Sequence, residues 1–334
     1  MLADPVQIRT SPKPDCPLCG AQGTTVHEGL RDRLFGAPGA WRLVRCPRDQ
    51  CGLIWPNPAP LTEDLHLAYR NYYTHEARTG LLGKVLYPSF AGAYQVAKLI
   101  PSIVVGLYRT RHRILHMFLD DLPPRRLFDA GCGDGAFLYR MRLRGWRGSG
   151  IDFDAAAVAA GKERYGLDLL EGDFLSTEIK ERDFDAVTMS HVIEHVPDPV
   201  ATIRKCRDLL RPGGRLVVTT PNARGLGYAR FGAAWRGLEP PRHLQIFSPL
   251  TLAECSRRAG VEVQEAGSTA ANADYLSAAS LAIEQAVENE PIGGGWKLGT
   301  ALPGVLFQYR EHFALRKDPL AGEEAYLISI RPPG

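Results

Sequence analysis

The sequence has almost no net charge, no low-complexity bias and no sign of a secretory signal. Its 40 basic residues exceed its 37 acidic residues by three, so a nucleic-acid partner would need a local basic patch. With 34 glycines and 25 prolines among 334 residues, the chain falls short of the composition of disordered proteins. The first residues lack the basic and apolar segments of a secretory signal, which predicts a cytoplasmic protein with reduced thiols.

Long apolar runs are also missing. A membrane-spanning helix needs about 20 uninterrupted apolar residues, and the most apolar stretch, residues 81–108, is divided by Lys84 and Lys98 and interrupted by Pro88 and Pro101. Basic residues follow it directly, at positions 109, 111 and 113. Residues 81–113 are therefore predicted either to form a packed helical linker or to touch a membrane surface peripherally.

Four of the seven cysteines lie in the first 51 residues. Cys16 and Cys19 form a C-x2-C pair, and Cys46 and Cys51 form a C-x4-C pair, each in a turn-rich segment. Such short spacings let two thiolates of one turn reach a tetrahedral zinc ion at about 2.3 Å. Four sulfurs would fill the coordination shell, so the pattern predicts a structural zinc ion that supplies much of the folding free energy of this segment. Unligated thiols and a redox role are the alternatives.

After Pro123-Pro124, short apolar runs alternate with helical patterns. This alternation predicts an α/β fold with a doubly wound, Rossmann-like parallel sheet that binds its ligand at the carboxyl ends of the strands. The expected strands are 126–130, 148–152, 169–171, 184–189, 215–220, 261–264 and 324–330, and the expected helices are 134–144, 154–165 and 198–210. The chain is accordingly predicted to comprise a zinc-ribbon-like module (1–60), a helical linker (61–122) and the α/β domain (123–334), with an insertion at about 272–320.

A glycine-rich loop, Asp-Ala-Gly-Cys-Gly-Asp-Gly, joins the first expected strand and helix at residues 129–135. Gly131 and Gly133 would let a ligand approach the backbone closely, and Asp152 stands at about the distance of the acid that binds a ribose. A pyrophosphate would meet the carboxylates of Asp129 and Asp134, which disfavours NAD. S-adenosylmethionine carries an ammonium and a sulfonium and suits these carboxylates better.

Residues 126–247 resemble the class I S-adenosylmethionine-dependent methyltransferases. Besides the glycine loop and Asp152, the family's order and spacing recur in Gly172-Asp173-Phe174, in His191-Val-Ile-Glu-His-Val-Pro-Asp-Pro199 and in Leu210-Arg-Pro-Gly-Gly214. The resemblance implies a seven-stranded sheet and a methyl donor as cofactor. The four-cysteine start is similar to the zinc-binding leader of a subgroup that includes sugar C-methyltransferases. Phe153, Asp173 and Phe174 are candidates for the adenine slot, and Ser190 and His191 are expected to line the cofactor or acceptor pocket.

The residues from His191 to His195 also match an inverted zinc-protease motif. Their place directly after a predicted strand favours the methyltransferase interpretation, and His195 is either a packed or a functional histidine. Methyl transfer needs alignment of nucleophile, methyl and sulfur, with a base where the acceptor loses a proton. His191 and His243 are the candidate bases. His243 is either an acceptor-site residue or a structural anchor of its loop. The same alternatives, contact with the acceptor or packing of the loop, apply to three further residues of this stretch: Trp235, Glu239 and Arg242.

Together these features predict methyl transfer from S-adenosylmethionine to an oxygen or carbon of a small molecule, such as a sugar, a lipid-linked glycan or a secondary metabolite. One alternative is a ribosomal RNA methyltransferase that binds RNA through its zinc module. The first 50 residues contain seven basic and five acidic residues. This excess of positive charge is too small to bind a phosphate backbone, which argues against a nucleic-acid partner. Another alternative is a relative that uses the cofactor site non-catalytically or for another reaction.

Overall fold

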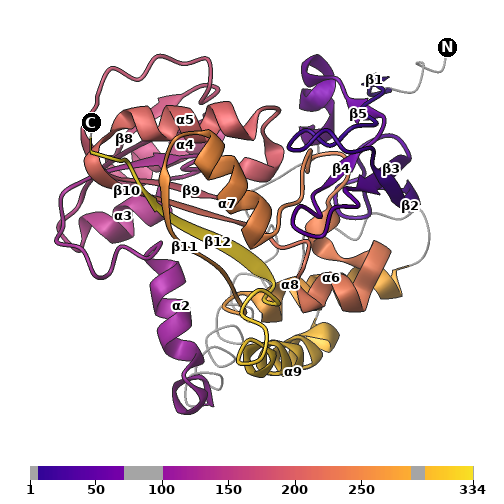
Figure 1. Cartoon of the computed structure of the whole chain (residues 1–334). Helices are drawn as coiled ribbons and strands as arrows, with labels where there is room; N and C mark the ends of the chain where they lie inside the picture. Colours follow the sequence, from indigo (N-terminus) through magenta and orange to yellow (C-terminus); the bar gives the residue numbers. More distant parts are fainter. Residues whose placement is uncertain (1–6, 71–100, 287–297, 334) are drawn as a thin grey trace.

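The computed structural model describes residues 7–70, 101–286 and 298–333. Its centre is a seven-stranded sheet of order β11-β12-β10-β9-β6-β7-β8 (Figure 1). Only β12 runs antiparallel to its neighbours. This confirms the predicted Rossmann-like, seven-stranded fold. The strands are β6 (Arg126–Ala130), β7 (Arg147–Asp152), β8 (Asp168–Glu171), β9 (Phe184–Ser190), β10 (Leu210–Pro221), β11 (Glu262–Thr269) and β12 (Glu324–Ile330).

Helices cover both faces of the sheet. Along β6, Leu127 joins one hydrophobic cluster with α3 (Ala136–Arg142) and α4 (Ala155–Tyr165), and Phe128 joins the other with α5 (Pro199–Leu209) and α7 (Pro249–Arg258). Because side chains of a strand alternate between faces, each strand in the middle of the sheet needs apolar residues at successive positions. This explains the continuous apolar runs that indicated a parallel sheet.

The ends of the elements follow local chemistry. Asp154 accepts hydrogen bonds from the backbone N–H groups of Ala156 and Ala157 and caps α4, and Asp198 caps α5 ahead of a first-turn proline. Helix α3 begins later than expected, because Gly133 and Gly135 have φ values of 53° and 73° that no right-handed helix adopts. Strand β10 begins earlier than expected and includes the Pro-Gly-Gly segment. Its pairing with β9 shifts register there, between positions 210 and 215.

The amino-terminal part contains a three-stranded antiparallel sheet of β2 (Thr24–Leu30), β3 (Trp41–Arg45) and β4 (Ile54–Pro56), a two-stranded pair of β1 (Thr10–Ser11) and β5 (Ala59–Pro60), and the 3-10 helix η1 (Thr62–Tyr69). Trp55 is fully buried in the same cluster as Phe247 and Leu252 of the large domain. A bridge between Ile54 and Ile246 joins the two parts. The module is therefore packed onto the sheet domain, and the predicted division at residues 60 and 122 stays a prediction.

Further helices gather near the end of the sheet where β12 begins (Figure 1). They are α6 (Leu226–Phe231), η3 (Gly232–Ala234), η4 (Arg236–Leu238), α8 (Ala273–Gln285) and α9 (Leu298–Ala314). The region predicted as an insertion thus contains α8 and α9, which pack against each other. The described residues of the predicted linker, 61–122, include η1 and α2 (Leu107–Leu115). The 3-10 helix η2 (Ile193–His195) belongs to the sheet domain and follows β9.

Residues 71–100 lie outside the described residues, so most of the segment predicted to touch a membrane, 81–113, is not placed. Among the helices that the structure does describe, none has the length and apolar character needed to cross a membrane.

Candidate functional site

The glycine loop makes a tight turn where β6 meets α3. The N–H of Gly131 donates to the carbonyl of Ile151 at 2.8 Å, and the N–H of Gly133 donates to Oδ2 of Asp152 at 2.8 Å. Gly131 has a φ of 81°, and a Cβ there would lie 2.1 Å from Cγ2 of Val192, so this position requires glycine. The structure thus brings Gly131, Gly133 and Asp152 together at one turn, with Asp129 at its start, and their role in holding the cofactor stays a prediction.

Two carboxyl groups border this turn. Asp129 is buried and its Oδ1 accepts a 2.6 Å hydrogen bond from Oγ1 of Thr188. Burial raises the pKa of Asp129 to about 7 against the effect of that hydrogen bond, and burial also raises the pKa of Asp152. A buried carboxyl with a raised pKa gains from a nearby positive charge. The turn therefore favours a cationic ligand.

The expected adenine slot is formed only in part. The ring of Phe153 is exposed, and the ring of Tyr69 from η1 meets it edge-on with centroids 5.4 Å apart. Asp173 accepts hydrogen bonds from the N–H and Oγ of Ser176, both at 2.9 Å. Phe174, by contrast, is buried in the hydrophobic core. The open aromatic surface therefore comes from Phe153 and Tyr69, and no short motif around Tyr69 indicated this neighbour.

A cavity of about 650 Å³ opens beside the loop. Its walls come from the glycine loop, from α2 and α3, from Ser102 ahead of α2, from the end of β9 and from Asn272 at the start of α8. The described residues that line it are Ser102, Tyr108, Arg111, His112, Ile114, Leu115, Met117, Asp129, Gly131, Cys132, Phe137, Arg140, Ser190 and Asn272. Four predicted site residues are neighbours of this space: Asp129, Gly131 and Ser190 line it, and His191 follows Ser190 in the chain.

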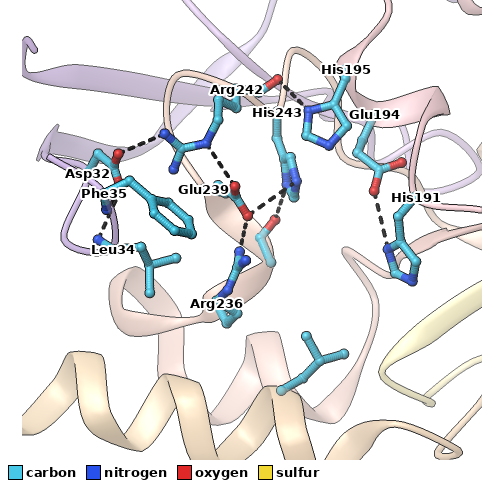
Figure 2. A network of polar contacts seen from close by, with 12 residues as sticks. Asp32, Leu34, Phe35, His191, Glu194, His195, Arg236, Glu239, Arg242 and His243 are labelled. Carbon is cyan, nitrogen blue, oxygen red and sulfur yellow. Dashed lines mark hydrogen bonds and ion pairs between the residues drawn. The ribbon is translucent and has the colours of Figure 1, made fainter. Parts of the chain in front are cut away.

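His191 is held between two buried carboxylates. Its Nε2 lies 2.7 Å from Oε1 of Glu324. Its Nδ1 lies 3.3 Å from Oε1 of Glu194, a contact drawn in Figure 2. Nδ2 of Asn272, which lines the cavity, donates to the other oxygen of Glu324 at 2.8 Å. Burial alone would lower the pKa of His191, but the two glutamates outweigh it and raise the pKa to about 10. A protonated imidazole has no lone pair for an acceptor proton, so these contacts favour a positioning role.

His195 and His243 lie deeper in the same polar network (Figure 2). Their rings meet edge-on with centroids 4.7 Å apart. Nδ1 of His195 lies 3.0 Å from the carbonyl of Arg242 and 3.1 Å from the hydroxyl of Tyr69. Nδ1 of His243 lies 2.7 Å from the carbonyl of Gly237. Both histidines therefore have backbone partners that fix their rings.

The inverted zinc-protease interpretation is not supported by these contacts. His191 pairs with Glu324, while His195 contacts the backbone of the loop that carries Arg242. Glu194, His195 and His243 do have ligand atoms within 4.8 Å of one another. However, Oε2 of Glu194 already accepts a 2.9 Å hydrogen bond from Oγ1 of Thr220. The three side chains thus belong to a hydrogen-bonded network of the protein.

His243, the first candidate base, is 4% exposed and is not among the described residues that line the cavity. Burial, together with the neighbouring His195, lowers its pKa to about 4. Its ring is enclosed by protein and contacts the carbonyl of Gly237 and the ring of His195. A catalytic role for His243 stays a prediction, and its surroundings favour the alternative of a loop anchor.

Replacing His243 by asparagine is expected to make the free energy of unfolding less dependent on pH between pH 4 and 6.5. Histidine in an unfolded chain has a pKa near 6.5, so between pH 4 and 6.5 the unfolded chain binds a proton that folded His243 does not. The wild-type protein must therefore lose stability as the pH falls through this window. Asparagine does not titrate and can still donate to Gly237. Urea denaturation at several pH values gives the free energy of unfolding, and its slope against pH should be smaller in the variant by up to about 1.4 kcal/mol per pH unit. An unchanged slope against pH would contradict the buried, neutral histidine.

The other residues of this loop are packed inside the protein. Nε1 of Trp235 donates to Oε1 of Glu323 at 2.5 Å. Arg242 is fully buried, and its guanidinium binds Oε1 of Glu239 and Oδ2 of Asp32, each at 2.8 Å. The loop-packing alternative therefore describes these three residues. Asp32 lies 210 positions away from Arg242, and nothing in the local sequence around either residue indicated the pair.

The four amino-terminal cysteines form a second candidate site. Sγ of Cys16 lies 3.7 Å from Sγ of Cys51, and Sγ of Cys19 lies 3.4 Å from Sγ of Cys46. All four sulfurs are within 4.8 Å of one another. Sulfurs at about 2.3 Å from a tetrahedral zinc ion would be roughly 3.8 Å apart. The donor set and its spacing therefore fit one zinc ion, and the longer second spacing is accommodated by a turn in which the N–H of Cys51 donates to the carbonyl of Arg48.

Comparison with known proteins gives the family. A family model described as a methyltransferase domain matches residues 106–266. A ubiquinone biosynthesis O-methyltransferase of Marinobacter nauticus is 34% identical over 159 residues, which cover 43% of this chain and 66% of that protein. The protein of the same name from Pseudomonas putida is 32% identical over 157 residues, with coverages of 43% and 67%. The chain thus spans about two thirds of the length of these relatives. It belongs to the class I S-adenosylmethionine-dependent methyltransferases.

Solved structures with a similar fold have low sequence identity. One is an S-adenosylmethionine-dependent methyltransferase of Thermotoga maritima, described as a possible histamine N-methyltransferase. It is 17% identical, with a TM-score of 0.44, and the match covers 71% of this chain and 95% of that one. Another is a putative sarcosine dimethylglycine methyltransferase from Galdieria sulphuraria. It is 15% identical, with a TM-score of 0.46 and coverages of 67% and 86%.

Proposed function

We propose that the protein transfers a methyl group from S-adenosylmethionine to an oxygen of a small-molecule acceptor, with a carbon acceptor as the alternative. The observation that carries this proposal is the pair of carboxyl groups, Asp129 and Asp152, at a glycine turn that opens into a cavity of about 650 Å³. The family supports the donor, and the names of the O-methyltransferase relatives support oxygen. A sugar, a lipid-linked glycan and a secondary metabolite stay the candidate acceptors.

Each group at the site has a definite task in this proposal. When bound, the cofactor supplies an electrophilic methyl group on a sulfonium. Asp152 accepts hydrogen bonds from the ribose hydroxyls, and the methionyl part lies in the cavity that Gly131 and Asp129 line. Ser190 and Asn272 line the cavity, and His191 reaches Asn272 through Glu324. These residues orient the acceptor, which is the main contribution that a displacement at carbon needs.

We further propose that Cys16, Cys19, Cys46 and Cys51 hold one structural zinc ion. Four thiolates leave no open coordination position for a substrate, so this ion would stabilise the fold rather than take part in methyl transfer. A cytoplasmic location and peripheral membrane contact stay predictions.

Titration with S-adenosylmethionine tests the cofactor site. The wild-type protein is expected to bind it, and Asp152→Asn is expected to bind it about 10- to 100-fold more weakly, because charge-assisted hydrogen bonds to the ribose are lost. Glu171→Gln is the matched control, since Glu171 is an exposed acid on β8 directly opposite Asp152. Binding of NAD in place of S-adenosylmethionine, or equal affinity in Asp152→Asn, would contradict the proposal.

A further inference from the structure

The described residues that line the cavity beside the glycine loop carry an excess of positive charge. Among its described lining residues, Arg111 of α2 and Arg140 of α3 are cations at every ordinary pH, and Asp129 is the single carboxylate. Neither arginine forms an ion pair within residues 7–70, 101–286 and 298–333. Buried Nε of Arg140 has no hydrogen-bond partner. Both arginines are half-buried, and Nη2 of Arg140 donates to the carbonyl of Leu115 at 3.5 Å. An oxyanion in the cavity could therefore form charge-assisted hydrogen bonds with these guanidinium groups.

The cofactor does not remove this excess. S-adenosylmethionine has two positive groups and one carboxylate, so it adds one positive charge to a cavity that already has a surplus of one. Its carboxylate can pair with only one arginine closely. Arg140 is the better partner for it, because Arg140 interacts electrostatically with Asp129 at the glycine loop. Among the described lining residues, none then supplies an anion to Arg111.

The segment of chain that carries Arg111 also contributes apolar residues to the cavity wall, next to Tyr108 and His112. Ile114, Leu115 and Met117 from the same segment of chain line the cavity, and Phe137 faces it from α3. A ligand that fills this space needs an apolar body to cover these side chains and an oxyanion to pair with the guanidinium.

We propose that the acceptor is an amphiphile with a carboxylate or phosphate group, and that Arg111 binds this anionic group while the apolar wall formed by α2 and α3 holds the rest of the molecule. This inference rests on the proposed function, because the charge balance includes the bound methyl donor. It narrows the acceptor from small molecules in general to anionic ones with an apolar part.

Calorimetric titration of the full-length protein saturated with S-adenosylmethionine tests the inference. The probes are octyl phosphate, octanoate and octanol, all below their micellar concentrations. Octyl phosphate and octanoate are expected to bind at least about tenfold more tightly than octanol, and the stronger of the two identifies the oxyanion. Because the donor adds positive charge, octyl phosphate is also expected to bind more weakly to the protein without S-adenosylmethionine.

Two variants of α2 provide the matched comparison. Arg111→Gln is expected to weaken octyl phosphate binding about tenfold or more, with S-adenosylmethionine affinity unchanged within a factor of two. Arg109→Gln removes an exposed cation of the same helix that does not line the cavity, and it should leave both affinities intact. Equal binding of octanol and octyl phosphate, or equal losses in the two variants, would overturn the inference. Failure of the wild-type protein to bind S-adenosylmethionine would instead overturn the proposed function, and the first titration reveals it separately.

Discussion

Replacing Cys16 and Cys19 by serine is expected to remove one equivalent of zinc and to abolish cooperative folding of the amino-terminal module. Structural zinc contributes roughly 10 kcal/mol or more to the folding of small zinc domains. Here Cys16 and Cys46 are buried in the same hydrophobic cluster as residues of the sheet domain, so the loss should reach beyond the module. Elemental analysis of the purified protein and thermal unfolding followed by circular dichroism measure the two effects.

The control for this prediction is Cys206→Ala. Cys206 is a fully buried thiol of α5 that is not one of the four candidate zinc ligands, and its loss should leave the zinc content unchanged. If the double serine variant cannot be purified, the wild-type protein still provides the test. Titration of its thiols with a mercurial should release one zinc ion per chain into a colorimetric dye. Wild-type protein without zinc, or a serine variant with full zinc and an unaltered melting curve, would refute the ligand set.

The large domain was predictable because its signals are local. The apolar runs around Phe128 and Val187 alternate with capped helices within short windows of sequence, and each central strand is apolar on both faces. The glycine loop was predictable for a related reason. Its backbone conformation needs glycine at fixed positions, so Gly131 and Gly133 mark the turn whatever the rest of the chain does.

The polar network beyond the loop could not be predicted because its partners are distant in sequence. His191 was identified as a site residue, but its charge depends on Glu324, which lies 133 positions further along the chain. His243 stands in a proline-rich loop of the kind that often faces a ligand. Its burial is caused by contacts that a local pattern does not contain, among them the neighbouring His195 from the turn after β9.

The contacts of Arg242 could not be predicted from local sequence either. Arg242 was predicted to contact an acceptor or to pack the loop, and the two alternatives differ only in what covers its side chain. In the structure the amino-terminal module covers it: the ring of Phe35 lies 4.8 Å from the guanidinium carbon, and the carbonyl of Ala68 accepts a 3.0 Å hydrogen bond. No property of the residues near Arg242 in sequence encodes this arrangement.

Replacing Arg242 by leucine is therefore expected to destabilise the protein by about 3–5 kcal/mol. The substitution leaves the carboxylates of Asp32 and Glu239 buried without the cation between them (Figure 2), and an uncompensated buried charge costs this much. Asp32 also accepts hydrogen bonds from the N–H groups of Leu34, Phe35 and Ala37, so its loop should loosen as well. Urea denaturation measures the first effect and hydrogen exchange at residues 34–37 measures the second.

Two further variants separate the buried pair from a general loss of charge. Arg230→Leu breaks the surface pair with Glu284, whose side chains are 46% and 41% exposed, and it should cost less than about 1 kcal/mol. Adding Asp32→Asn to Arg242→Leu should restore part of the lost stability, because one of the stranded charges disappears while the amide oxygen can still accept from the loop. An Arg242→Leu variant no less stable than Arg230→Leu, or a double variant with additive losses, would show that the ion pair does not hold the module against the methyltransferase domain.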